Sequence, residues 1–257
     1  MTLKPFTLSI LILITSFIYA QSEEVKKAIT FYNNRADGHT GLTAKPENIN
    51  NAIAILEKAH QSNPTETTYE YLLRSYYFKA AFVVSGKKDQ KYWYNKGKVL
   101  GEEAIKKYPE NVSILYWTIA NFGKWGEAYG IMASAKEGLA DVLKELTEKL
   151  IKLDPKFANG GGYRILGVMH YKVPKIPFIT PWPSFEEAEK NLKKALAINP
   201  KLPSNLYYYA EFLKEDKRKP EAKAFLKIAL KSSPRKEYLL EDLWDIEQAK
   251  KLLTTFE

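Results

Sequence analysis

Small and apolar residues recur along the chain at helical spacing, and each run ends at a proline. The steps between them are 4, 3 and 5 residues in three runs, which lie within residues 52–64, 188–200 and 222–234. Positions i, i+4 and i+7 share one face of an α-helix, and small side chains there let a neighbouring helix approach closely. Because a proline disfavours the helical conformation of the residue before it, each run predicts a helix that ends there.

Five such prolines divide the chain into units. They are Pro64, Pro109, Pro155, Pro200 and Pro234. Each follows two helical stretches, for example 69–82 and 91–107, so each unit is expected to form a helix–turn–helix hairpin. Successive prolines lie 45, 46, 45 and 34 residues apart, so the repeats are irregular. The pattern predicts an all-α array of about five stacked hairpins.

The last unit resembles a complete tetratricopeptide repeat. Its first helix has Leu206, Tyr209, Ala210 and Leu213, and its second has Ala222, Leu226, Ala229 and Pro234. The fourth unit is similar, but an insertion at residues 172–184 separates its two helices. The resemblance implies a right-handed α–α solenoid of about five tetratricopeptide-like hairpins, forming a single domain over residues 21–257.

Over residues 23–250 the chain also resembles the T-component family of TRAP transporters. The matching residues are Leu115-Tyr116-Trp117, Gly123-Lys124-Trp125, and the run from Gly160 to Gly167 followed by Pro174. This resemblance implies a periplasmic protein that holds an apolar small ligand and docks a solute-binding partner protein. It also implies that the three glycines at 160–162 and Arg164 lie near the concave surface.

The first residues carry a pattern typical of a secretory signal peptide. Lys4 precedes an apolar stretch over residues 8–18, and the small residue Ala20 is followed by polar positions. The apolar stretch is short for a membrane-spanning helix, so an uncleaved anchor is the weaker alternative. We expect a signal peptide over residues 1–20 and a secreted or periplasmic protein. Because position 21 is Gln, we do not expect a cysteine-anchored lipoprotein.

Composition and charge narrow the function classes. The formal net charge is +9, but the lysines alternate with glutamates, as at Glu145 and Lys149, which is typical of a solvated helix face and not of nucleic-acid binding. The chain has no cysteine and three histidines that are far apart, so thiol chemistry and a histidine metal site are not expected. The glycines at 160–162 follow no strand and precede no Lys-Ser/Thr pair, which excludes a P-loop. We therefore expect no catalytic residues, no metal and no cofactor.

Aromatic residues give the candidate ligand-binding positions. The first helices of the second and third units are aromatic nearly all round, which favours packing and leaves an aromatic-lined groove as the alternative. The insertion at 172–184 has four prolines and several apolar side chains, so it either folds back as a lid or is presented to a partner. The candidates are Tyr116, Trp117, Trp125, Tyr163, Arg164, Phe178 and Trp182.

Two hypotheses for the function follow. The preferred one is a T-component-like protein that holds an apolar small ligand and docks a solute-binding protein. The alternative is a tetratricopeptide scaffold that captures an extended peptide or a helix of an envelope protein in its groove. An enzyme is least favoured, and the sequence leaves assembly into a homo-oligomer open.

Overall fold

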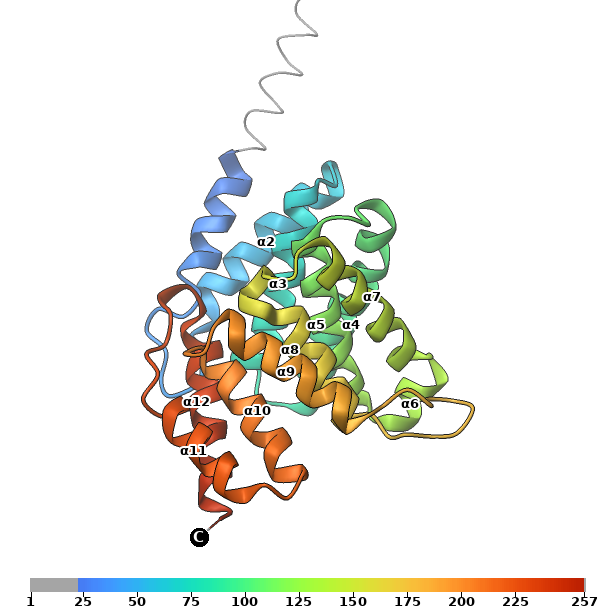
Figure 1. The fold of residues 1–257 in the computed structure, drawn as a ribbon. Helices are drawn as coiled ribbons and strands as arrows, with labels where there is room; N and C mark the ends of the chain where they lie inside the picture. The colour runs from blue at the N-terminus through green and yellow to red at the C-terminus, as the bar shows by residue number, and fades with distance from the viewer. Residues whose placement is uncertain (1–22, 257) are drawn as a thin grey trace, which may run out of the picture.

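The computed structural model describes residues 23–256, and this part of the chain is all-helical (Figure 1). Its only β pairings are two isolated bridges, Thr40 with Thr43 and Ile176 with Thr180. The signal peptide predicted over residues 1–20 lies outside the described residues. Between residues 23 and 256, no helix is both long enough and apolar enough to cross a lipid bilayer.

The helices pair into hairpins in chain order. A helical stretch over residues 23–33 is followed by α2 (Pro46–Ser62), α3 (Glu66–Phe82), α4 (Lys87–Lys107), α5 (Val112–Tyr129), α6 (Ile131–Lys136), α7 (Leu139–Leu153), α8 (Phe157–Lys172), α9 (Phe185–Ile198), α10 (Pro203–Glu215), α11 (Lys219–Ala229), the 3-10 turn η1 (Lys236–Tyr238) and α12 (Leu239–Thr254). The hairpins are 23–33 with α2, α3 with α4, α5 with α7, α8 with α9, and α10 with α11. The predicted helical solenoid of hairpins is confirmed.

Prolines end four of the second helices as predicted. The residues before them, Asn63, Tyr108, Asp154 and Asn199, are non-helical with ψ between 61° and 97°. The prediction for the fifth stop was wrong, because α11 ends at Ala229, ahead of Ser233. There, Lys231 and Ser232 donate their backbone N–H groups to carbonyls three residues earlier, so the last turn tightens before the proline is reached.

Polar residues and prolines fix where helices begin. The side chains of Thr65, Asn111 and Ser184 each accept the backbone N–H three residues later, which caps α3, α5 and α9. A proline stands in the first turn of α2, α10 and α11, where its missing N–H costs no helical hydrogen bond. These local signals therefore mark where the helices begin.

Small residues set the closest helix contacts. Gly97 of α4 packs directly on Asn121 of α5, and Gly161 of α8 packs on the ring of Tyr116. The first turn of α8 is kinked by left-handed residues, which include Asn159 with φ 56° and Gly160 with φ 80°. The glycines at 160–162 are all buried, and their lack of side chains lets neighbouring helices approach this kink closely.

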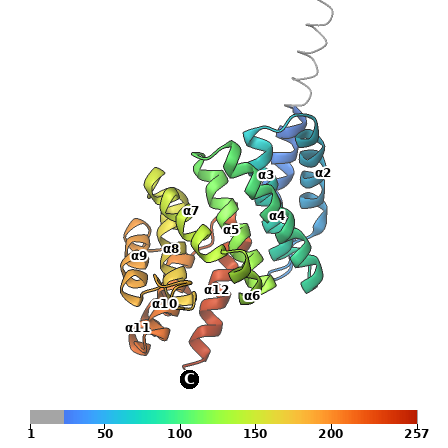
Figure 2. The ribbon, with the colours of Figure 1, turned by 90° about the vertical axis from the view of Figure 1, so that its right-hand side faces the viewer.

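The last helix, α12, is shared between two parts of the solenoid. Its C-terminal half and the residues just after it pack on α10 and α11, where Ala249, Leu252 and Phe256 join an apolar cluster. Figure 2 shows α12 beside α10. Its N-terminal half reaches the first helices of other hairpins through side chains, since Leu240 joins the core of the first two hairpins and Lys124 of α5 stands over the ring of Trp244. We call the side formed by these first helices (23–33, α3, α5, α8 and α10) the inner face.

Candidate functional site on the inner face

Residues 235–245, which we call the inner segment, occupy the inner face of the solenoid. Leu240 is fully buried in the core cluster of the first two hairpins. Tyr238 packs on the cluster that joins α3 and α5. Trp244 lies edge-on to Tyr207 of α10, with ring centroids 6.2 Å apart, and Lys124 Nζ of α5 stands 5.4 Å from its ring. One short segment therefore contacts hairpins from both ends of the solenoid.

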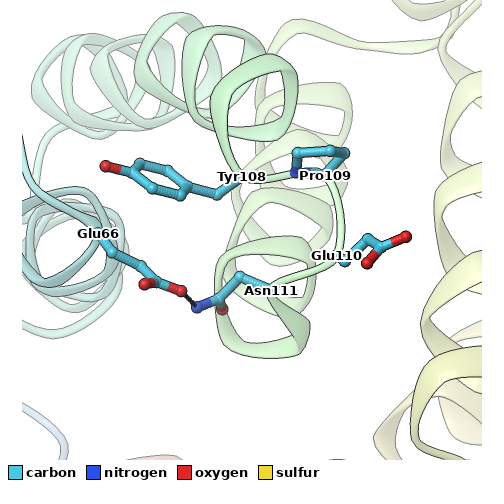
Figure 3. Close-up of a pocket in the computed structure, with 5 residues that line it drawn as sticks. All are labelled: Glu66, Tyr108, Pro109, Glu110 and Asn111. Atoms are coloured by element: carbon cyan, nitrogen blue, oxygen red, sulfur yellow. Dashed lines mark hydrogen bonds between the residues drawn. The ribbon is translucent and has the colours of Figure 1, made fainter.

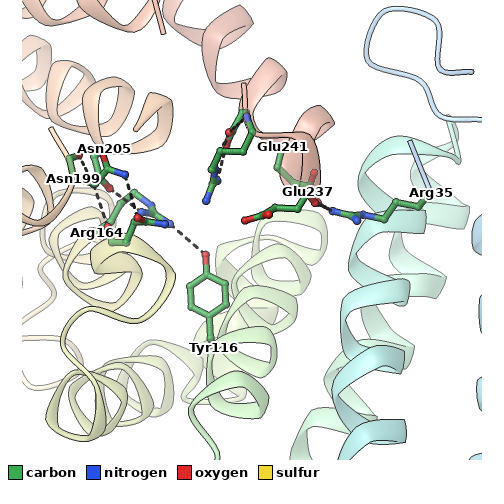
Figure 4. Close-up of polar contacts among 10 residues, drawn as sticks. Arg35, Tyr116, Arg164, Asn199, Asn205, Glu237 and Glu241 are labelled. Atoms are coloured by element: carbon green, nitrogen blue, oxygen red, sulfur yellow. Dashed lines mark hydrogen bonds and ion pairs between the residues drawn. The ribbon is translucent and has the colours of Figure 1, made fainter. Parts of the chain in front are cut away.

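Arg35 ties the inner segment to the first hairpin. Its guanidinium donates to the backbone carbonyl of Glu237 at 2.6 Å and to Glu241 Oε1 at 2.9 Å, a pairing across 206 residues of sequence (Figure 4). The Arg35 side chain is only 4% exposed and lies over the rings of Tyr32 and Phe78. A buried cation of this kind needs its anionic partner, because an unpaired charge in the interior is strongly unfavourable.

A second ion pair shapes the inner segment itself. The carboxylate of Asp242, which is 1% exposed, accepts the backbone N–H of Arg235 at 2.8 Å and two guanidinium N–H groups at 2.8 and 2.7 Å. Asp242 lies in the first turn of α12, where the helix dipole also favours a negative charge. The pair therefore fixes the direction in which the chain enters α12.

A third polar group connects the fourth hairpin with its neighbours. Arg164 of α8 donates to Asn205 Oδ1 at 2.8 Å and to the hydroxyl of Tyr116 at 3.2 Å (Figure 4). Asn205 in turn donates to the carbonyl of Ala195 at 2.8 Å. The structure thus brings together two sequence-predicted candidates, Tyr116 and Arg164. Sequence reasoning missed Asn205, although a polar residue inside the apolar stripe of α10 was a signal.

Asp245 is a buried carboxylate near the centre of this region. Burial raises its pKa from 3.8 to about 7; nearby Arg164 and Lys124 oppose this rise, while the neighbouring Asp242 reinforces it. Among the described residues it forms no ion pair within 4.0 Å. The phenols of Tyr77 and Tyr208 also lie close by, and burial raises both of their pKa values.

Hydrogen bonding around the inner segment is incomplete. Four buried polar atoms near it have no hydrogen-bond partner: Arg35 Nε, Arg74 Nε, Glu241 Oε2 and the hydroxyl of Tyr32. Buried polar atoms are usually paired, and each unpaired one costs roughly 1–3 kcal/mol. The inner segment is therefore held by strong individual contacts whose net stabilisation is reduced by these unpaired groups.

The other predicted aromatic residues lie elsewhere. Trp117 is buried in the core between α3 and α5, and Trp125 is buried with its indole N–H donating to Asn95 Oδ1 at 3.1 Å. Tyr163 is half-buried on α8, with Lys194 Nζ 5.0 Å from its ring. The buried positions of Trp117 and Trp125 agree with packing, the favoured interpretation of the aromatic helices, and not with a lined groove.

The proline-rich insertion combines both predicted behaviours. The indole of Trp182 donates to Asp141 of α7 at 2.7 Å and meets the ring of His170 edge-on at 5.2 Å, so the base of the loop folds back. Phe178 at the tip is fully exposed with φ 64°, and Ile179 beside it is 58% exposed. The tip therefore presents apolar side chains to the surroundings.

Two surface hollows lie away from the inner segment. The larger, about 410 Å³, sits at the turn between α4 and α5 and is lined by Glu66, Tyr108, Pro109, Glu110 and Asn111 (Figure 3). There the side chain of Asn111 caps α5 and also donates to Glu66. The smaller, about 220 Å³, includes Glu57, His60 and Lys96. Neither hollow contains a predicted candidate, and no group of three or more His, Asp or Glu residues between 23 and 256 could hold a metal ion.

The stacked hairpins and their inner face define a helical-repeat protein of tetratricopeptide type. The family model described as regulator of microtubule dynamics protein 1-3 matches residues 42–257, and the chain belongs to that family. Comparison with curated proteins gives no match. No comparison supports the finer resemblance to TRAP-transporter T-components.

Solved structures of tetratricopeptide proteins are similar to this chain. The protein TTC0263 of Thermus thermophilus superposes with a TM-score of 0.61 at 16% identity, over 91% of this chain and 99% of that one. A point mutant of MamA gives a TM-score of 0.49 at 17% identity, over 84% and 98%. The TPR2AB domain of yeast Sti1, in a complex with pHSP90, gives 0.35 at 15% identity, over 92% and 98%. At these identities the likeness to TTC0263 shows the fold alone.

Proposed function

We propose that the chain is a non-enzymatic scaffold that binds a helical segment of a partner protein on the inner face. The observation that carries this proposal is that the inner face already holds a helix, through Arg35, Lys124 and the aromatic residues around Tyr207. Cations spaced along a groove with aromatic rings between them suit an amphipathic helix that carries carboxylates. The family description names microtubule dynamics, so microtubules are one partner to test, and the export proposed below would exclude them.

Site-specific photo-crosslinking tests this proposal. A photoreactive residue replaces Glu127, an exposed position of α5 beside the inner face, or Lys227, an exposed position of α11 as the matched control. We expect one defined partner to crosslink at position 127 and not at 227. Its binding to the full chain, measured with purified proteins by calorimetry, should weaken on Lys124→Glu. Equal crosslinking at both positions, or binding that ignores Lys124→Glu, would contradict the proposal.

The apolar-ligand hypothesis, with the solute-binding partner it implies, has less support. Both surface hollows carry charged side chains, and two of the candidate aromatic residues are packed in the core. Native mass spectrometry of the full chain, purified from its own host, tests it directly. A bound apolar molecule would favour this function, and its consistent absence from folded protein would count against it.

Export through residues 1–20 is a separate proposal, supported by the sequence pattern. N-terminal sequencing of the protein from its host should find a chain that begins at Gln21, in the secreted or periplasmic fraction. A chain that begins at Met1 in the cytosolic fraction would contradict it.

A further inference from the structure

We infer that the inner segment is an exchangeable occupant of the inner face. A partner helix replaces it when that helix carries carboxylates at positions i and i+4 and large apolar side chains at i−1 and i+3. This inference rests on the proposed function, because it specifies which kind of partner the inner face binds and what must leave first.

The sequence of α12 defines that pattern. Glu241 and Asp245 are four residues apart and share one stripe of the helix, and Leu240 and Trp244 form the adjacent stripe. Both stripes face the solenoid, because Leu240 and Asp245 are buried and Glu241 pairs with Arg35. A helix from another protein with these groups would meet the same cations and the same apolar surface.

The inner face supplies complementary charges from separate hairpins. Lys124 belongs to α5, and Figure 4 shows the other two cations, Arg35 after the first helix and Arg164 in α8. All three lie near carboxylates of the inner segment. Arg35 pairs with Glu241, and Lys124 and Arg164 favour the ionised form of Asp245, although burial outweighs them and raises the pKa of this carboxyl. The cations are part of the solenoid, so they remain in place when the segment leaves.

The two halves of α12 are held differently. The C-terminal half is held by apolar contacts to α10 and α11, which involve Ala249, Leu252 and Phe256. The N-terminal half brings buried charge to the inner face, and there Arg35 Nε and Glu241 Oε2 lack partners. Because unpaired buried polar groups offset part of the docking free energy, the N-terminal half is the part that exchanges.

The absence of cysteine from the chain permits a clean test in the full-length protein. Asn34→Cys and Glu237→Cys introduce thiols at two exposed positions. One is next to Arg35 in the chain, and the other is the residue whose backbone carbonyl accepts from Arg35. A short bis-maleimide then ties the inner segment to the first hairpin. The probe is a fluorescent synthetic peptide with the sequence of residues 239–254, and its binding is followed by fluorescence anisotropy.

With a competing occupant, the apparent affinity equals the intrinsic affinity multiplied by the fraction of time for which the site is empty. We therefore expect the peptide to bind the untied chain and to bind Glu241→Gln about tenfold more tightly, since that change weakens the cis occupant. Glu247→Gln, which alters an outer position of the same helix paired with Lys251, is the matched control and should leave binding unchanged. A peptide with lysine at the positions of Glu241 and Asp245 should not bind.

The tied protein gives the deciding result. We expect the bis-maleimide to reduce peptide affinity at least about tenfold, while both single-cysteine variants capped with N-ethylmaleimide bind as the untied chain does. Equal binding to tied and untied protein would overturn the inference, and so would the absence of binding to Glu241→Gln that is folded by circular dichroism. A dimer that exchanges α12 between copies, detected by light scattering, would also overturn it.

The proposed function fails or survives separately. If a partner still crosslinks at position 127 while the tie leaves its binding unchanged, the inner face binds partners without exchange. The scaffold function then stands and the exchange does not.

Discussion

Replacing Gly97 with alanine tests the closest helix contact in the solenoid. A Cβ atom at this position of α4 would overlap the side chain of Asn121 on α5. Asn121 is fully buried, and its amide donates to the carbonyls of Leu73 at 3.0 Å and Trp117 at 2.8 Å. One methyl group therefore pushes on a residue that joins α3, α4 and α5.

The expected cost follows from three contributions. Overpacking a tight core typically costs about 1–3 kcal/mol. Displacing the Asn121 amide leaves its buried N–H donors unpaired, which costs roughly 1–3 kcal/mol more. Alanine regains up to about 1 kcal/mol over glycine in a helix interior. Together these contributions lower the free energy of unfolding of Gly97→Ala by roughly 1–6 kcal/mol.

Urea unfolding followed by far-UV circular dichroism measures this change. Gly123→Ala in α5 is the matched control, because nothing lies within 4 Å of a Cβ built there, and it should stabilise the fold by up to about 1 kcal/mol. Adding Asn121→Ala to Gly97→Ala removes the overlapping atoms and should recover part of the loss. If Gly97→Ala is as stable as Gly123→Ala, or if Asn121→Ala restores nothing, the contact does not have the role assigned to it.

Three further predictions concern α12 and the proline-rich loop. Leu240→Ala should destabilise the fold by about 2–5 kcal/mol in urea unfolding, because it leaves a cavity at a fully buried site between α12 and the first hairpin. An unchanged stability would mean that the inner segment does not dock in solution. Burial raises the pKa of Asp245 from 3.8 to about 7, so between these pH values the folded state binds a proton that the unfolded state lacks, and stability falls as the pH rises. Asp245→Asn should remove this pH dependence and gain at most about 4 kcal/mol of stability above pH 7, and an unaltered pH profile would refute the assignment. Phe178→Ser at the exposed loop tip should change the free energy of unfolding by less than about 0.5 kcal/mol, whereas Trp182→Ala should lower it by about 1–2 kcal/mol, because the hydrogen bond to Asp141 is lost. Equal thermal midpoints for the two variants would contradict the folded-back loop base.

The inner face and its occupant were only partly predictable. The sequence predicts Tyr116 and Arg164 as site residues, and they do meet there. It does not indicate Asn205, Glu241 or Asp245. The missed residues belong to the C-terminal units, whose sequence pattern indicates a helix and does not indicate what that helix covers. Contacts that join distant parts of the chain leave no periodic signal.

Aromatic residues show the same limit. Trp117 and Trp125 have the spacing expected both of a core and of a lined groove, and the structure buries both. Phe178 and Trp182 lie four residues apart in one loop, yet one is fully exposed and the other is packed against α7 and α8. Side-chain type alone did not distinguish them.

By itself, the sequence determined the helices, most of their boundaries and their pairing into hairpins. These features depend on local sterics: a proline excludes the helical conformation just before it, and small residues at i, i+4 and i+7 permit close packing. The tertiary structure alone decided that α12 turns back onto the inner face and that Arg35 meets Glu241 across 206 residues. This contact depends on the curvature of the whole solenoid, which is the sum of small rotations between successive hairpins. No single stretch of sequence encodes that curvature.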